Sequence, residues 1–287
     1  MKVQIKNKKF FRQLLYYFCR YISEKNISKN KQLAGLSFDA IQNYINIFGI
    51  YEENELKLLK KFIINNINDP GLALDLGANI GNHTCNLFSD LFKEVHCYEP
   101  NKKIFDLLKI NCSELSNVRI RNIGIGEVNE TVILEHCLTN WGASKVSSNL
   151  SIKLNTDKKN FSTIEIKKLD DIYKNEKKKI DLIKLDIEGY ELNALRGGQK
   201  IIKNFLPVVI FEENKINKEG RSEVIDFLKD FNYEFYILEE NFYFGEGKFF
   251  KLLKYLLQDI FGTKIKLKKI IKFKKRFYHL IFAKSIN

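Results

Sequence analysis

Short apolar runs alternate with amphipathic segments from residue 72 onward, and this alternation constrains the fold more than any other feature. The runs have the length of buried strands, and the segments between them place apolar side chains three and four residues apart, as helices do. The expected strands are 72–76, 94–99, 118–125, 180–187, 207–213, 233–238 and 277–285, and the expected helices are 80–92, 102–115, 191–205 and 222–231. Repeated strand–helix–strand units indicate a mostly parallel, doubly wound α/β sheet with helices on both faces.

A helical section precedes this alternation. Its segments carry apolar side chains at helical spacing, and they are 8–22, 37–48 and 53–67. We therefore expect the chain to divide into an N-terminal helical section, 1–70, and an α/β domain, 71–287.

Two insertions are expected inside the α/β domain. The first follows the third strand, where three β-like runs occur without helices between them: 131–137, 144–151 and 163–169. The second, 244–276, is rich in lysine and includes an amphipathic helix over 248–261, with Gly262 as its stop. This basic insertion stands immediately before the last strand.

The positive charge is concentrated at the two ends of the sequence. The formal net charge is +13; residues 1–32 contribute +8 and residues 248–287 contribute +11, so that residues 33–247 carry −6. Such asymmetry is typical of proteins that meet a polyanion or an anionic membrane surface. An AT-rich coding sequence would also favour lysine, but it does not explain why the ends hold so much of the excess.

The cysteines and the apolar runs favour a cytoplasmic protein. The five cysteines are irregularly spaced and form no C-x-x-C pair, as expected of free thiols in a reducing compartment. Arg12 and Arg20 interrupt the apolar N-terminal stretch, which argues against a signal peptide. No apolar run approaches the roughly 18 residues that cross a bilayer. Any contact with a membrane is therefore expected to be peripheral, at its inner face.

The turn after the first expected strand has the residues of a ligand-binding loop. The stretch ALDLGANIGNHTC, residues 73–85, places Gly77 and Gly81 four residues apart. Gly77 allows a sharp turn, and Gly81 allows a ligand to approach backbone N–H groups. In a doubly wound sheet such a loop lies at the carboxyl ends of the strands, where ligands bind. The G-x-G-x-x-G spacing of dinucleotide sites is absent, which disfavours a pyrophosphate ligand.

Carboxylates follow two other strands at the same edge. Glu99 comes twenty-four residues after Asp75, where an acidic side chain accepts hydrogen bonds from both hydroxyls of a ribose; capping of the next helix is the alternative. Lys184, Asp186 and Glu188 alternate along the fourth strand, so we expect them on one side of it. Charges in so apolar a strand require a polar cavity or, alternatively, a structural ion pair of Lys184 with a carboxylate.

These motifs, in this order, resemble the FkbM-type family of S-adenosylmethionine-dependent methyltransferases. The resemblance extends over about 35–240 and rests on FGIYEENEL (48–56), DLGANIGNHT, CYEPN, NWGAS, LDDI, DLIKLDIEGYELNALRGG and PVVIFEE. It implies a Rossmann-like class I methyltransferase fold with a seven-stranded sheet whose last strand is antiparallel. It also implies S-adenosylmethionine as cofactor, with Asp75, Gly77, Asn79 and Gly81 around its methionine part and Glu99 at its ribose.

The activity implied by the resemblance is O-methylation of a hydroxyl, often on a sugar or glycan. We expect a bacterial surface polysaccharide or a nucleotide-sugar precursor as the acceptor. We also expect the Lys-rich stretch 263–276 to meet phosphate of some kind, in the substrate or at a membrane surface.

A sugar hydroxyl is a poor nucleophile until its proton is withdrawn, so a general base is expected within hydrogen-bond reach of it. Asp186 and Glu188 rank first, because the end of the fourth strand faces the methyl group in this fold class. His83 and Glu212 are the other candidates for the base. Lys184 would hold a carboxylate in place or contact an anionic substrate.

Trp141 and Glu212 are the expected contacts to the acceptor. An indole stacks on sugar rings, although ordinary packing would explain Trp141 equally well. Asp186, Glu188 and Glu212 also offer oxygen ligands to a divalent ion, but we expect no metal site.

Two other functions stay open. A nucleic-acid methyltransferase would grip phosphates with the basic ends, but no RNA-binding module is evident, and the Asn/Asp-Pro-Pro-Tyr-type segment of enzymes that methylate base amines is missing from the fourth strand. A scaffold that binds the cofactor without turnover is the other alternative; the intact loop, Glu99 and Asp186 argue against lost cofactor binding. The sequence does not specify an oligomeric state.

Overall fold

A computed structural model of the chain describes residues 9–27, 32–37, 39–137, 144–147, 161–240 and 265–286. Trp141 and the helix expected over 248–261 lie outside these residues. The described helices are α1 (Lys9–Ile27), α2 (Ala40–Phe48), α3 (Glu53–Asn66), the π-helical turn η1 (Thr84–Phe88), α4 (Ser89–Leu91), α5 (Lys102–Asn111), α6 (Leu169–Ile172), α7 (Glu191–Gly197), α8 (Gln199–Phe205) and α9 (Glu223–Lys229). The described strands are β1 (Leu72–Leu76), β2 (Glu94–Tyr98), β3 (Val118–Arg121), β4 (Gly124–Ile125), β5 (Glu130–Glu135), β6 (Lys145–Ser147), β7 (Phe161–Lys167), β8 (Ile180–Leu185), β9 (Val208–Glu213), β10 (Tyr233–Glu240), β11 (Ile265–Ile270) and β12 (Tyr278–Ser285).

The main sheet confirms the fold class expected from the sequence. Over the described residues its strand order is β11-β10-β12-β9-β8-β1-β2-β3. Five neighbouring strands, β9, β8, β1, β2 and β3, pair in parallel. Strand β12 is antiparallel to both of its neighbours, β9 and β10. This is the doubly wound, Rossmann-like arrangement with an antiparallel last strand.

The sheet has one strand more than expected, because part of the basic insertion is a strand. Ile265–Ile270 pairs antiparallel with β10 and forms the edge strand β11. Lys266 and Lys268 lie 3.1 and 2.7 Å from the carboxylate of Glu239, and Lys269 pairs with Glu234. These lysines therefore neutralise glutamates of the neighbouring strand, so less of the positive charge of this stretch is available for the phosphate expected there.

A second, smaller sheet has the order β4-β7-β5-β6 and confirms the insertion of β-like runs. The strand expected over 118–125 is in fact two strands, β3 in the main sheet and β4 in the second one. Asn122 lies at the break, and its amide nitrogen donates to the carbonyl oxygens of Glu99 and Pro100 at 2.8 and 3.0 Å. This side chain therefore fixes the point at which the chain leaves the main sheet.

The helix expected over 191–205 is also divided, into α7 and α8. The division falls at Gly197 and Gly198. A Cβ atom on Gly197 would lie 1.9 Å from the carbonyl oxygen of Gly126, so the helix and the turn after β4 approach through their backbones.

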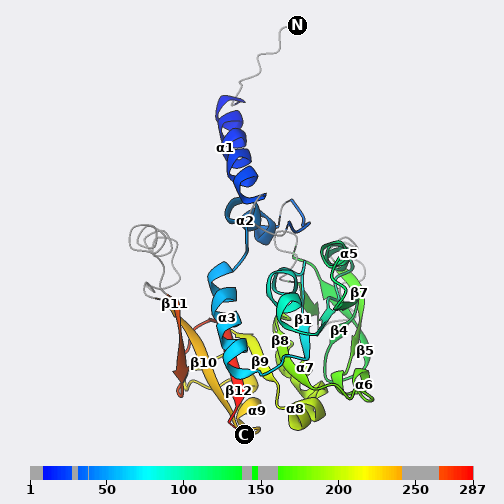
Figure 1. Cartoon of the computed structure of the whole chain (residues 1–287). Helices are drawn as coiled ribbons and strands as arrows, with labels where there is room; N and C mark the ends of the chain where they lie inside the picture. Colours follow the sequence, from blue (N-terminus) through cyan, green and yellow to red (C-terminus); the bar gives the residue numbers. More distant parts are fainter. Residues whose placement is uncertain are drawn as a thin grey trace.

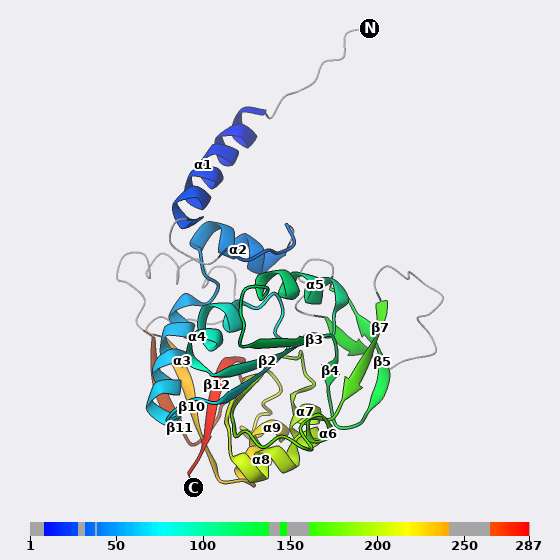
Figure 2. The ribbon, with the colours of Figure 1, turned by 45° about the vertical axis from the view of Figure 1, so that its right-hand side comes forward.

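The two faces of the main sheet each carry a hydrophobic core. Helices α6 to α9 pack on one face, and α3, η1 and α5 pack on the other (Figures 1 and 2). Helix α3 buries Leu59 and Ile63 completely, and its Phe62 ring lies 5.2 Å from that of Phe282 in β12. Helix α1 instead projects away from the sheet and meets the domain through α2 (Figure 1).

Candidate active site

The loop between β1 and η1 is tied to the ends of three strands. The N–H groups of Gly77 and Ala78 donate to the carbonyl oxygen of Tyr98 at 2.9 and 3.0 Å. Gly77 has a φ of +75°, and a Cβ atom there would lie 1.9 Å from the carbonyl oxygen of Asp186. Only glycine satisfies both the turn and the approach of the residue after β8, so Gly77 makes the sharp turn expected of it.

Asn79 and Gly81 continue the loop with positive φ angles of 51° and 91°. The N–H of Asn79 donates to the carboxylate of Glu99 at 3.1 Å. The Cβ direction of Gly81 points into the core, 2.9 Å from Leu108 and 3.3 Å from the sulfur of Cys85. The lack of a side chain at Gly81 therefore allows the loop to pack on α5, and the approach of a ligand to its backbone stays a prediction.

Charged groups lie buried beneath the loop. Asp75 is fully buried, accepts a hydrogen bond from Thr84 at 2.7 Å and lies 3.1 Å from the ammonium of Lys184. Lys184 also donates to the carbonyl oxygen of Gly77 at 3.3 Å and lies 3.5 Å from Asp186. Burial lowers the pKa of Lys184, but the charges of Asp75 and Asp186 outweigh it and raise that pKa above its ordinary value. Asp75 and Lys184 thus support the loop from below.

Glu99 is a buried carboxylate directly beside this loop. It is 8% exposed and accepts hydrogen bonds from the N–H groups of Asn79 and, at 2.8 Å, Asn101. Burial raises the pKa of Glu99 to about 7, and the two backbone hydrogen bonds offset only part of this increase. Each carboxylate oxygen keeps a second lone pair, so Glu99 can accept two further hydrogen bonds from a ligand.

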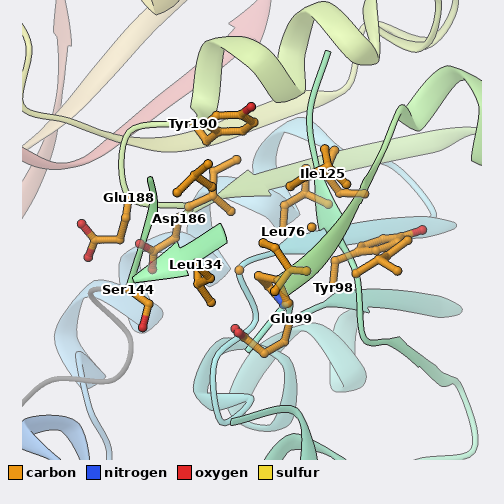
Figure 3. A pocket seen from close by; sticks show the side chains of 17 residues that line it. Leu76, Tyr98, Glu99, Ile125, Leu134, Ser144, Asp186, Glu188 and Tyr190 are labelled. Carbon is orange, nitrogen blue, oxygen red and sulfur yellow. The ribbon is translucent and has the colours of Figure 1, made fainter. Parts of the chain in front are cut away.

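A cavity opens between Glu99 and the end of β8 (Figure 3). Its charged lining residues are Glu99, Asp186 and Glu188, and Figure 3 shows the last two on one side of the cavity and Glu99 on another. Much of the apolar lining comes from the second sheet and the residue before it: Ile123, Ile125, Leu134, Val146, Ile164 and Ile166. The sequence predicts the strands of this wall through their alternation but gives no sign that they face a ligand site.

Asp186 and Glu188 lie past the end of β8, and of the two only Asp186 forms an ion pair with Lys184 among the described contacts, at 3.5 Å. Strand β8 ends at Leu185, and Glu188 has a φ of +52°. The strict alternation expected through Glu188 is therefore wrong, because the chain turns before that residue. The nearest cation to Glu188 among the described ion pairs is Lys145, at 3.9 Å. Burial, followed by the charge of Asp186, raises the pKa of Glu188.

A second cavity adjoins the first and shares Glu188 with it. The residues that line it are Glu188, Gly189, Glu191, Leu192, Glu212, Glu213, Asn214, Lys215, Ser222, Glu223 and Val224. Burial and the charge of Asp186 raise the pKa of Glu212, at the end of β9, to about 7. Glu212 is thus brought to the same edge as Asp186 and Glu188, in a predominantly acidic pocket.

His83 lies in a different cluster, which the sequence did not predict. Its Nε2 atom is 3.0 Å from one carboxylate oxygen of Glu52, and Nε2 of His279 is 2.6 Å from the other. Burial lowers the pKa of His279, but Glu52 and, less strongly, Glu212 raise it to about 9. His83 is largely buried and lines neither of the two cavities. Glu52 belongs to the FGIYEENEL motif, but no local signal marks His279.

The first cavity fits a nucleoside better than a metal ion. A carboxylate with two free lone pairs suits the hydroxyls of a ribose, and the apolar wall suits a flat aromatic base. Among the residues that the structure describes, no group of three or more His, Cys, Asp or Glu side chains is arranged to hold a metal ion.

Comparisons with solved structures give several distant matches. The methyltransferase FkbM from Methylobacillus flagellatus KT is 18% identical, with 69% of this chain and 48% of that chain covered and a TM-score of 0.37. A SAM-dependent O-methyltransferase from Thermotoga maritima is 10% identical, with 86% and 72% covered and a TM-score of 0.41. An rRNA methylase from Streptococcus thermophilus is 10% identical, with 80% and 95% covered and a TM-score of 0.39. The chain spans about half the length of the first of these structures.

The comparison with curated proteins finds no significant match. A family model described as the methyltransferase FkbM domain matches residues 75–235, which is more than half of the chain. The matched range runs from Asp75 beneath the loop to β10, and it contains Glu99, Asp186 and Glu188 of the first cavity. The resemblance seen in the sequence is confirmed, and the chain belongs to the FkbM family of S-adenosylmethionine-dependent methyltransferases.

Proposed function

We propose that the protein methylates a hydroxyl of a sugar or glycan, in the synthesis of a bacterial surface polysaccharide or of its nucleotide-sugar precursor. The observation that carries this proposal is the acidic second cavity, which shares the lining residue Glu188 with the first one. Carboxylates accept hydrogen bonds from the many hydroxyls of a sugar, whereas they repel phosphate. The same chemistry disfavours a nucleic acid beside Glu212, and the phosphates of a nucleotide-linked precursor would bind outside this cavity.

The residues of the first cavity fit the cofactor of the family. S-adenosylmethionine, when bound, supplies an electrophilic methyl group. Ionised Glu99 would accept hydrogen bonds from the ribose hydroxyls, and the apolar wall, which includes Ile125 and Ile164, would cover the adenine. Gly77 and Asn79, with the support of Asp75 and Lys184, would hold the loop open for the methionine part.

Asp186 and Glu188 are the two candidate bases, and their surroundings support separate roles. Asp186 lies 3.5 Å from Lys184, which orients its carboxylate. Glu188 lines both cavities and has a raised pKa, which suits proton removal nearer neutral pH. We therefore propose Glu188 as the group that takes the hydroxyl proton and Asp186 as a group that orients the acceptor. Glu212 would bind another hydroxyl of the acceptor.

The other predicted residues keep smaller parts in this proposal. His83 is engaged with Glu52, so it would act through that cluster rather than on the acceptor directly. Trp141 stays a predicted contact to a sugar ring. The division of the chain at residue 70 stays a prediction; α3, on its N-terminal side, shares a hydrophobic core with the main sheet.

Calorimetric titration with S-adenosylhomocysteine is the first test. We expect wild-type protein to bind it and Glu99→Ala to bind it at least about tenfold more weakly, because two charge-assisted hydrogen bonds are lost. Glu223→Ala is the matched control, since it removes a carboxylate from the second cavity only. Absence of binding to wild-type protein would contradict the cofactor site.

Methyl transfer to a panel of acceptors tests the substrate class. Neutral glycans, nucleotide sugars and an RNA oligonucleotide would be compared with the same radiolabelled donor. We expect transfer to a carbohydrate, and a loss of about 100-fold or more in kcat for Glu188→Gln with unchanged binding of S-adenosylhomocysteine. Methylation of RNA alone, or full turnover by Glu188→Gln, would show that the proposal is wrong.

A further inference from the structure

Helix α1 exposes an unusual number of large apolar side chains. Eight of them are between 56% and 75% exposed, and they are Phe10, Phe11, Leu14, Leu15, Tyr16, Tyr17, Phe18 and Tyr21. The helix projects away from the domain beyond α2 (Figures 1 and 2). Its attachment lies near its C-terminal end, where the hydroxyl of Ser23 donates to the carbonyl oxygen of Asn46 at 3.0 Å.

These side chains are not scattered around the helix. At about 100° per residue, all of them except Tyr16 fall within an arc of about 160°. The opposite side carries Arg12, Gln13, Arg20 and Glu24 together with Tyr16, and Lys25 lies within the apolar arc at the C-terminal end of the helix. Helix α1 is thus amphipathic, with an aromatic apolar face whose side chains stay more than half exposed in the described part of the chain.

The apolar face of α1 could contact a second copy of the chain or a lipid surface, and the charge around it favours the lipid surface. Residues 1–32 carry nine Lys and Arg residues against one Glu. A second copy of the chain would bring an equal positive charge alongside, which is unfavourable. An anionic lipid surface would attract that charge, and Phe, Tyr, Leu and Arg are the residues of helices that lie in the plane of a membrane interface.

We propose that α1 lies in the interface of an anionic lipid bilayer, with the face centred on Phe11 and Phe18 in the acyl region and Arg12 and Arg20 toward the headgroups. Within the described ranges, no helix has the combination of length and apolarity that crossing a membrane requires. The binding is therefore peripheral. It is independent of methyl transfer and of the identity of the acceptor.

Vesicle co-sedimentation of the full chain tests this proposal. The probes are vesicles of phosphatidylcholine alone and of phosphatidylcholine mixed with phosphatidylglycerol. The test variant is Phe11→Asp with Phe18→Asp. The matched control is Ile110→Asp with Val128→Asp, which makes the same chemical change at two exposed apolar side chains elsewhere on the surface. Circular dichroism verifies that both variants are folded.

We expect wild-type protein and the control to bind the anionic vesicles, more weakly at high salt, and the α1 variant to bind at least about tenfold more weakly. No binding of wild-type protein to anionic vesicles, or an equal loss in the control, would overturn the proposal. Light scattering in the absence of lipid measures whether the protein forms a dimer, the alternative in which a second copy covers the apolar face. A dimer that Phe11→Asp with Phe18→Asp dissociates would assign the apolar face to a second copy instead.

Discussion

Two sets of charged groups lie at the same edge of the main sheet in different surroundings. The first set is Asp75 with Lys184 beneath the loop, and the second is Glu99 with Glu212 at the two cavities. Asp75, beneath the loop, is fully buried but lies against the ammonium of Lys184 and the hydroxyl of Thr84. Glu99 and Glu212, at the two cavities, have pKa values raised to about 7, chiefly by burial. The difference indicates that the paired charges fix the shape of the loop, whereas the carboxylates at the cavities are held ready for ligands that donate hydrogen bonds.

Removal of the Lys184 ammonium from the first set should cause the largest loss of stability. Lys184→Met leaves Asp75 buried without its ammonium partner, and we expect the free energy of unfolding to fall by about 3–5 kcal/mol. Urea denaturation measures this loss. Lys145→Met is the control, because that side chain is exposed and lies 3.9 Å from Glu188; its expected cost is about 0–1 kcal/mol. Equal effects of the two changes would remove the distinction between the two sets.

A change at the turn that joins the two sets should have the next largest effect. Gly77→Ala combines a strained φ of +75° with a methyl group directed at the carbonyl oxygen of Asp186. We expect a loss of about 1–3 kcal/mol in stability and weaker binding of S-adenosylhomocysteine. Gly189→Ala has a similar φ of +94°, but its methyl group would meet the flexible end of Lys215. Thermal unfolding measures both variants, and a melting temperature that is no lower for Gly77→Ala than for Gly189→Ala would contradict this explanation.

The pH dependence of cofactor binding probes the second set directly. Ionised Glu99 accepts hydrogen bonds from ribose hydroxyls, and protonation removes part of that capacity, so affinity should rise as pH rises through the pKa of about 7. We expect the dissociation constant for S-adenosylhomocysteine to fall about tenfold from about pH 6 to about pH 8. Calorimetry at several pH values measures this. The dependence should vanish in Glu99→Gln and persist in Glu212→Gln; persistence in both would assign it to another group.

Much of the fold could be predicted because buried parallel strands have a strong local signature. LALDL and IDLIKL are recognisable as strands from their own residues, and the loop after β1 has its glycines in sequence. Strand β11 was missed because its alternation is interrupted by Lys268 and Lys269 in a stretch dominated by lysine. The break between β3 and β4 was missed because it depends on hydrogen bonds from Asn122 to residues more than twenty positions earlier.

In the candidate site, too, the features that depend on contacts between distant residues could not be predicted. Asp75, Gly77 and Glu99 could be named from local spacing, since each stands at the end of a strand. The turn that redirects Glu188 is marked in the sequence only by Gly189, whose φ is +94°, and no residue type marks the φ of +52° at Glu188 itself. The pairing of Glu52 with His279 joins positions 227 residues apart, so only the folded chain reveals it.

This last contact has a consequence for how the protein is made. Strand β12 lies between β9 and β10, and His279 near its start binds Glu52 next to the loop after β1. During synthesis the first strands and the loop leave the ribosome long before β12 does. The main sheet therefore stays incomplete and Glu52 stays without His279 until β12 has emerged, which delays ligand-competent folding until more than two hundred residues beyond the loop have been synthesised.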